Sequence, residues 1–175
     1  MATRKSNNIW VIVGILIIAA WLIGSVTQAG AQTLKWRQVM FNAKVEIIQM
    51  GDVPDHIIGL YDQTGLASFE KGEEASVATK GTLDYIKGSG TIQGYNILTF
   101  EDGSTTTSKY QGTTRSDPSG KSSWFEATWT LIQGTGRWTG IKGGGTMTGR
   151  RFAPAIGVAT QLYLDYTGTY TLPPK

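Results

Sequence analysis

The ionisable residues that could serve acid–base chemistry are few in this chain. His56 is its only histidine, and it precedes Asp62 and Glu70 around a short predicted hairpin. A carboxyl or imidazole group among apolar neighbours has a shifted pKa and can act as a general acid or base. These three residues are therefore weak candidates for a catalytic set. Ordinary surface turn residues are the competing interpretation.

Aromatic residues with a polar tip form a second set of candidates. Tyr and Trp bury large rings but need partners for their O–H and N–H groups. Five of them fall on strand faces that we expect to point inward, and we predict that these residues line a ligand cavity: Tyr61, Tyr85, Tyr110, Trp129 and Tyr166. Ordinary core packing is the alternative role.

Other catalytic and metal-binding patterns are not found. The chain has no cysteine, and Asp52, Asp55 and Asp62 lack the spacing of a calcium-binding loop. No Gly-x-Ser-x-Gly motif occurs, and the Gly143–Gly145 run does not open a helix, so neither a serine nucleophile nor a phosphate-binding loop is indicated. We predict no metal and no cofactor, and a non-catalytic role is favoured. An enzyme on this scaffold would be of isomerase or cyclase type.

The elements that must position these residues are strands. Short runs of alternating apolar and polar residues recur between Gly, Asp, Asn, Ser and Pro clusters, and helical periodicity is nearly absent. The Asp-Gly pair within 101–104 is a strong hairpin signal. We expect about eight strands, over residues 39–50, 56–61, 75–87, 91–100, 105–114, 123–133, 137–149 and 161–172.

The alternation also assigns the faces of these strands. In 123–133, Phe125, Ala127, Trp129 and Leu131 share one apolar face, because side chains two residues apart lie on the same side of a strand. One face is therefore core and the other is solvated. Repeated without intervening helices, this all-β pattern suits a closed up-and-down antiparallel barrel or a sandwich.

A glycine-rich segment favours the barrel. Residues 134–149 read Gly-Thr-Gly-Arg-Trp-Thr-Gly-Ile-Lys-Gly-Gly-Gly-Thr-Met-Thr-Gly, and 166–170 read Tyr-Thr-Gly-Thr-Tyr. The first resembles the Gly-aromatic-x-Gly-Ile-x-Gly hairpin of the allene oxide cyclase-like and dirigent-like β-barrels, and the second resembles their closing strand. Residues 56–69 resemble an early hairpin of the same barrels.

The resemblance implies an eight-stranded antiparallel barrel with a tapered apolar cavity. In the plant members of this superfamily it implies a role in cyclising or steering reactive small molecules. It carries no catalytic residue over to this chain. Two departures from the plant cyclases, the absence of cysteine and a bacterial type of N-terminal segment, indicate an exported bacterial member of unknown function, to which the plant substrate is not carried over.

The N-terminal segment predicts export. Arg4 and Lys5 precede an uncharged apolar run over residues 9–23, and Ala29 and Ala31 form an Ala-x-Ala cleavage site. We predict a signal peptide over 1–31, with a single barrel domain over 32–175 in the periplasm or outside the cell. An uncleaved anchor helix is the alternative, because residues 9–26 approach the length that spans a bilayer. Membrane contact is expected only through this segment.

Charge narrows the partners. Removing Arg4 and Lys5 lowers the formal net charge from +3 to +1, since the segment holds none of the 13 acidic residues, and Arg150-Arg151 is the one basic doublet that remains. Nucleic-acid-binding proteins concentrate positive charge, so we predict no nucleic-acid partner.

Three functions stay open from the sequence. The first is binding of a small apolar or amphipathic molecule inside the barrel, since eight-stranded barrels can enclose one. The second is a cyclase or isomerase acting in that cavity. The third is a non-catalytic structural or interaction module of the envelope, with homo-oligomers as one form. The third would use a contiguous apolar patch outside the barrel or at its rim, for which we predict Trp124, Trp138 and Tyr163.

Overall fold

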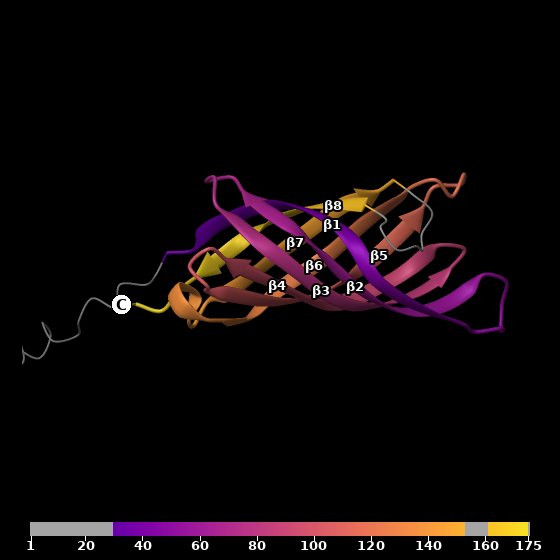
Figure 1. The fold of residues 1–175 in the computed structure, drawn as a ribbon, viewed down its shortest axis with the longest axis horizontal. Coiled ribbons are helices and arrows are strands. Elements are labelled where there is room, and N and C mark those ends of the chain that lie inside the picture. The colour runs from indigo at the N-terminus through magenta and orange to yellow at the C-terminus, as the bar shows by residue number, and fades with distance from the viewer. Residues whose placement is uncertain (1–29, 153–160, 175) are drawn as a thin grey trace, which may run out of the picture.

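The computed structural model describes residues 30–152 and 161–174. Eight antiparallel strands form one closed barrel, in which each strand pairs with the next in sequence and β8 pairs with β1 (Figure 1). The predicted all-β up-and-down barrel is confirmed. The elements are β1 (Gln32–Gln49), β2 (His56–Phe69), β3 (Glu74–Ile86), β4 (Ser89–Phe100), β5 (Thr105–Ser116), β6 (Ser123–Gly134), a 3-10 turn η1 (Gly136–Trp138), β7 (Lys142–Arg151) and β8 (Gln161–Thr171).

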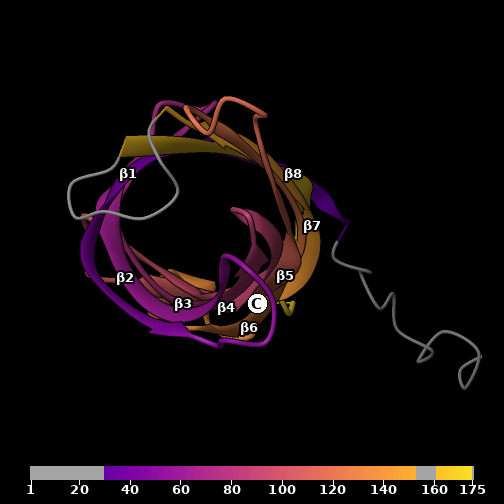
Figure 2. The ribbon, with the colours of Figure 1, turned by 90° about the vertical axis from the view of Figure 1, so that its right-hand side faces the viewer.

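The two ends of the barrel differ. We call the mouth the end that carries the β1–β2, β3–β4, β5–β6 and β7–β8 connections, and the base the end that carries the other three connections and both ends of the described chain. Figure 2 looks onto the mouth, where the strands form a complete ring. The pairing of β1 with β8 ends at Phe41, whereas its pairing with β2 continues to Gln49. The β1–β2 hairpin therefore projects beyond the rest of the mouth (Figure 1).

Residues 56–69 are one continuous strand, so the early hairpin expected there is wrong. The polar run from Asp62 to Thr64 and the following Gly65 look like a turn, yet all of them pair with both β1 and β3. A Cβ atom on Gly65 would lie 2.1 Å from the carbonyl oxygen of Val39. The glycine is therefore required by the close approach of β1, not by a reversal of the chain.

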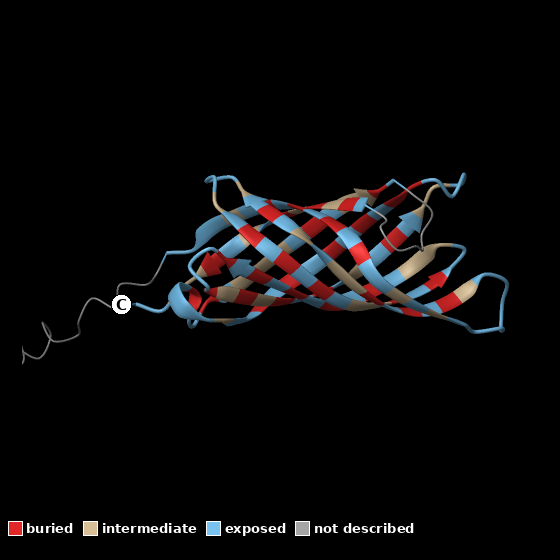
Figure 3. Ribbon diagram, in the orientation of Figure 1, coloured by how far each residue is buried: buried red, intermediate tan, exposed pale blue. Residues whose placement is uncertain are grey.

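Strand alternation builds the core. Buried and exposed residues alternate along most of the barrel wall, most clearly in β3 to β6, so one face of the strands lines the interior (Figure 3). Trp36 stacks on Tyr166 with ring centroids 4.3 Å apart, and Trp129 meets Trp36 edge-on at 5.1 Å. These rings fill the middle of the barrel.

The base is closed by a further aromatic cluster. Trp138, carried by η1, lies 5.3 Å from Phe100 and 5.6 Å from Tyr170 between ring centroids. Trp138 lies at the end of the barrel but is buried, so it does not contribute to an outer apolar patch: the 3-10 turn delays the start of β7 to Lys142 and folds the indole into the barrel. Only about 10 Å³ of space remains among the side chains of the base.

The predicted signal segment falls almost wholly on residues 1–29, which lie outside the described residues, as does Ala29. Ala31 is described and directly precedes β1. In the described part of the chain, no helix is long and apolar enough to cross a membrane.

Candidate functional site

A small chamber lies inside the mouth half of the barrel. Its volume is about 30 Å³, enough to admit a water molecule. Its walls combine apolar side chains with hydroxyl groups and one guanidinium. The apolar contributors include Val45, Leu83, Ile92, Leu162 and Leu164, and the polar ones include Tyr61, Tyr85, Tyr110, Tyr166 and Arg151.

Two hydroxyl pairs tie strands together around the chamber. The hydroxyl oxygens of Tyr61 and Tyr110 are 2.5 Å apart, and those of Tyr85 and Thr114 are 2.7 Å apart. Burial raises the pKa of each of the three phenols, so all stay protonated at neutral pH. Within each pair one hydroxyl donates to the other, which leaves one O–H group for a further acceptor.

Glycines make room for the phenol pair. A Cβ atom on Gly81 would lie 2.5 Å from the Tyr61 hydroxyl, and one on Gly94 would lie 2.6 Å from the Tyr110 hydroxyl. Gly81 and Gly94 face each other across β3 and β4. The barrel wall is thin here, because Tyr61 contacts both the chamber and a hollow of about 490 Å³ on the outer surface.

The outer hollow is a weaker candidate than the chamber. It is open to solvent, and exposed side chains of both charge signs border it, among them Lys80 and Asp62, which pair at 3.0 Å. None of the described residues that line it is a buried polar group without a partner. The interior chamber does contain such a group.

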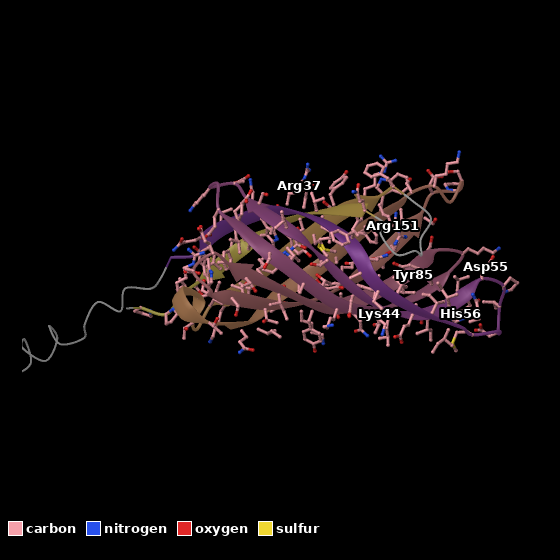
Figure 4. The ribbon with its side chains drawn as sticks, viewed as in Figure 1. Arg37, Lys44, Asp55, His56, Tyr85 and Arg151 are labelled. Atoms are coloured by element: carbon pink, nitrogen blue, oxygen red, sulfur yellow. The ribbon has the colours of Figure 1, made fainter. Side chains whose placement is uncertain are left out.

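Arg151 is the cation of the chamber. It ends β7 on the inward face and is 5% exposed (Figure 4 shows it toward the mouth, with Tyr85). Its Nη2 donates to the Ser123 hydroxyl at 3.0 Å, and its guanidinium lies 5.3 Å from the centre of the Phe125 ring. Its Nε–H has no hydrogen-bond partner. Burial lowers the pKa of Arg151, but a guanidinium remains charged in proteins at neutral pH.

No carboxylate balances this charge. All 13 acidic residues of the chain lie within the described residues, and none of them is buried. The ionisable groups that act on Arg151 are the neutral phenols of Tyr85 and Tyr61. The described interior therefore carries one positive charge and no negative one.

All five aromatic residues predicted to line a cavity point into the barrel. Tyr61, Tyr85, Tyr110 and Tyr166 border the chamber. Trp129 lies deeper, where its Nε1 donates to the Thr146 carbonyl oxygen at 3.0 Å. Their role in binding stays a prediction.

The three weak catalytic candidates are not brought together. His56 begins β2 and Glu70 follows its last residue, so a whole strand separates them, and Glu70 pairs with Lys35 at the base. Asp62 points outward to Lys80. The set depended on a hairpin that the chain does not form.

His56 is fully engaged at the rim of the mouth. Its Nδ1 lies 2.6 Å from Oδ1 of Asp52, and its Nε2 lies 2.9 Å from Oδ1 of Asp84. Hydrogen bonds to Asp84 and Asp52 raise the pKa of His56, and the bond from His56 lowers the pKa of Asp52. His56 therefore fastens the β1–β2 hairpin to β3 and has no ring nitrogen left for a substrate. Among the described residues, no three His, Asp or Glu side chains are placed to hold a metal ion.

Arg151 was not predicted from the sequence as a site residue and was noted only as half of the basic doublet Arg150-Arg151. The alternation of β7 contains the signal: Met147, Gly149 and Arg151 share the inward face. Arg150, one residue earlier, points outward and lies 5.0 Å from the Trp124 ring.

Comparison with solved structures identifies similar barrels. A conserved protein of unknown function from Rhodopseudomonas palustris superposes with a TM-score of 0.54 at 10% identity, covering 80% of this chain and 98% of that one. The barrel is of the type that the resemblance implies. Two pterocarpan synthase dirigent proteins superpose with TM-scores of 0.47 and 0.40 at 9% and 11% identity, covering 98% and 83% of this chain and 97% and 96% of theirs.

These similarities concern the fold alone. No protein-family model matches the chain, and no curated protein matches it in sequence.

Proposed function

We propose that the chain is an exported barrel that binds a small amphipathic molecule through the chamber at its mouth. The observation that carries this proposal is the chamber lining, in which apolar side chains surround a few inward-pointing polar groups, one of them a buried guanidinium. Ligand sites in proteins have this composition.

The size of the chamber constrains the ligand. With about 30 Å³ of free space, the chamber accepts only a polar head group or a very small molecule as it stands. A larger ligand must part the side chains at the mouth, where Val45 lies on the projecting hairpin beyond the end of the β1–β8 pairing. Beyond Phe41 the β1 arm pairs with β2 alone, so parting its side chains disturbs less structure than opening the ring.

The test is native mass spectrometry of the protein purified from its own host, with denaturing extraction and identification of any released compound. A bound small molecule supports the proposal, and a clean apo mass counts against it. The matched variants are Ile92→Trp, which fills the chamber, and Thr91→Trp, which adds the same indole to the exposed face of β4. We expect the compound to be lost only from Ile92→Trp.

The cyclase or isomerase alternative needs a general acid or base, and the chamber lining does not offer an obvious one. Among the described residues, the groups that line the chamber include no carboxylate and no histidine, and burial raises the pKa of its phenols. A reaction there would have to depend on shape and on the guanidinium. Binding without chemistry is therefore the function that the site supports best.

The envelope-module alternative has one supporting observation. A cross-strand row of outward residues runs from Val39 through Tyr163 and Arg150 to Trp124, and Trp124 is 42% exposed. Trp124→Ser should leave the barrel folded. A shift of the native mass from oligomer to monomer in this variant would support a role in self-association. An unchanged assembly state would count against that role.

A further inference from the structure

We propose that the ligand of the mouth chamber is an organic monoanion whose carboxylate head group pairs with Arg151. This inference rests on the proposed function and specifies its ligand class. Three observations carry it: the unbalanced charge, the hydrogen-bond donors that have no acceptor and the match between one guanidinium and one carboxylate.

The first observation is the charge itself. A buried ion without a counter-ion is strongly unfavourable in a protein interior. The guanidinium of Arg151 interacts with the hydroxyl groups of Ser123 and Tyr85 and with the ring of Phe125. None of these partners carries a negative charge. An anionic ligand would supply the charge that the chain itself does not place near the guanidinium.

The second observation is the direction of the available hydrogen bonds. The Nε–H of Arg151 has no acceptor, and the Tyr61–Tyr110 pair, both of whose residues line the chamber, has one O–H beyond the bond that joins the two phenols. These groups donate, and the guanidinium among them would repel an amine. An oxyanion accepts such bonds and gains the stronger, charge-assisted ones.

The third observation is the fit of the head group. The Nε–H forms one arm of the planar fork with which arginine binds a carboxylate through two parallel hydrogen bonds. One guanidinium matches the single charge of a carboxylate. A phosphate monoester carries up to two charges, which one guanidinium does not balance.

The experiment compares acids with their alcohols. Binding of hexanoate, decanoate and 3-phenylpropanoate to the purified full-length protein is measured by titration calorimetry, each beside the alcohol of the same carbon skeleton. We expect at least one acid to bind about 10- to 100-fold more tightly than its alcohol, the range for hydrogen bonds to a charged group. The straight-chain and aromatic members distinguish a fatty acid from an aromatic acid as the source of the carboxylate.

Two arginine variants provide the matched pair. Arg151→Met should lower the affinity for the acid to that of the alcohol. Arg150→Met, on the outer face of the same strand, should leave both affinities unchanged. Arg151→Met removes an unpaired buried charge, so we expect its Tm to be equal or higher. If it fails to fold, Arg151→Lys keeps the charge without the planar fork, and its preference for the acid should fall.

The remaining outcomes separate the two proposals. Equal affinities for acid and alcohol would overturn the carboxylate inference and leave the binding function standing. Failure of every compound to bind, together with an apo mass for the protein from its host, would overturn both. Unchanged acid binding in a destabilised Arg151→Met would assign Arg151 a structural role and also overturn the inference.

Discussion

At the scale of single residues, the hydrogen bond between Tyr61 and Tyr110 links β2 to β5 across the barrel interior. Substitutions at the two positions should therefore have non-additive effects on the free energy of unfolding. Tyr61→Phe leaves the Tyr110 hydroxyl buried without its partner, which should lower the free energy of unfolding by about 1–3 kcal/mol. Tyr110→Phe should cost a similar amount. The double variant removes both hydroxyls and should cost less than the sum of the two single changes. Urea denaturation of the four proteins measures the coupling, and strict additivity would contradict a functional hydrogen bond.

Gly94 makes a second residue-scale prediction. A Cβ atom there would lie 2.4 Å from the Lys80 carbonyl oxygen as well as close to Tyr110, so the backbone itself must shift. Gly94→Ala should lower the free energy of unfolding by about 1–3 kcal/mol, the usual cost of overpacking a core. Gly30→Ala is the control, since a Cβ atom on Gly30 would have no neighbour within 4 Å. Equal denaturation midpoints for the two variants would refute the steric argument.

At the scale of elements, His56 makes the attachment of the β1–β2 hairpin depend on pH. The raised pKa of His56 stabilises the folded state fully below its unfolded value of about 6.5, and this contribution is lost as the pH rises through the folded pKa. The lowered pKa of Asp52 stabilises the folded state fully above the unfolded pKa of about 3.9. This stabilisation is lost as the pH falls through the folded pKa. The contact is therefore strongest between these two values.

Hydrogen exchange can measure this dependence. Amide protection factors in residues 50–58 should fall between pH 5.5 and pH 8.5 in the natural protein. In His56→Gln the protection factors should be low at both pH values. In Asp84→Asn they should also be lower than in the natural protein. Equal protection in all three proteins would show that other contacts hold the hairpin.

The elements also show how far the sequence could be read. Clean alternation located β4, β5 and β6 to within three residues at each end. The first part of β1 was missed because Gln38, a polar residue, occupies an inward position and is fully buried there. The inward positions of the tyrosines could be predicted because side chains two residues apart lie on the same face of a strand. The same rule places Arg151 inside, but a buried arginine without a carboxylate contradicts the usual preference of charged side chains for solvent, so it was not predicted.

At the scale of the whole molecule, the start of the barrel bears on processing. β1 begins at Gln32, and Oε1 of Gln32 accepts a hydrogen bond from the Tyr170 hydroxyl at 2.7 Å. Cleavage after Ala31 would therefore leave every residue of β1 in place. We expect the intact mass of the exported protein to correspond to residues 32–175. A mass that includes residues 1–31 would support the retained anchor instead.

The closure of β1 on β8 has a consequence for how the barrel is made. Every other pairing joins strands that are consecutive along the chain, whereas this one joins residues as far apart as Gln32 and Tyr170. Closing so long a loop carries the largest entropic cost of any pairing here. A chain that crosses a membrane N-terminus first delivers β1 at the start and β8 last. Until β8 is available, β1 presents an unpaired edge, which is a template for pairing with another chain.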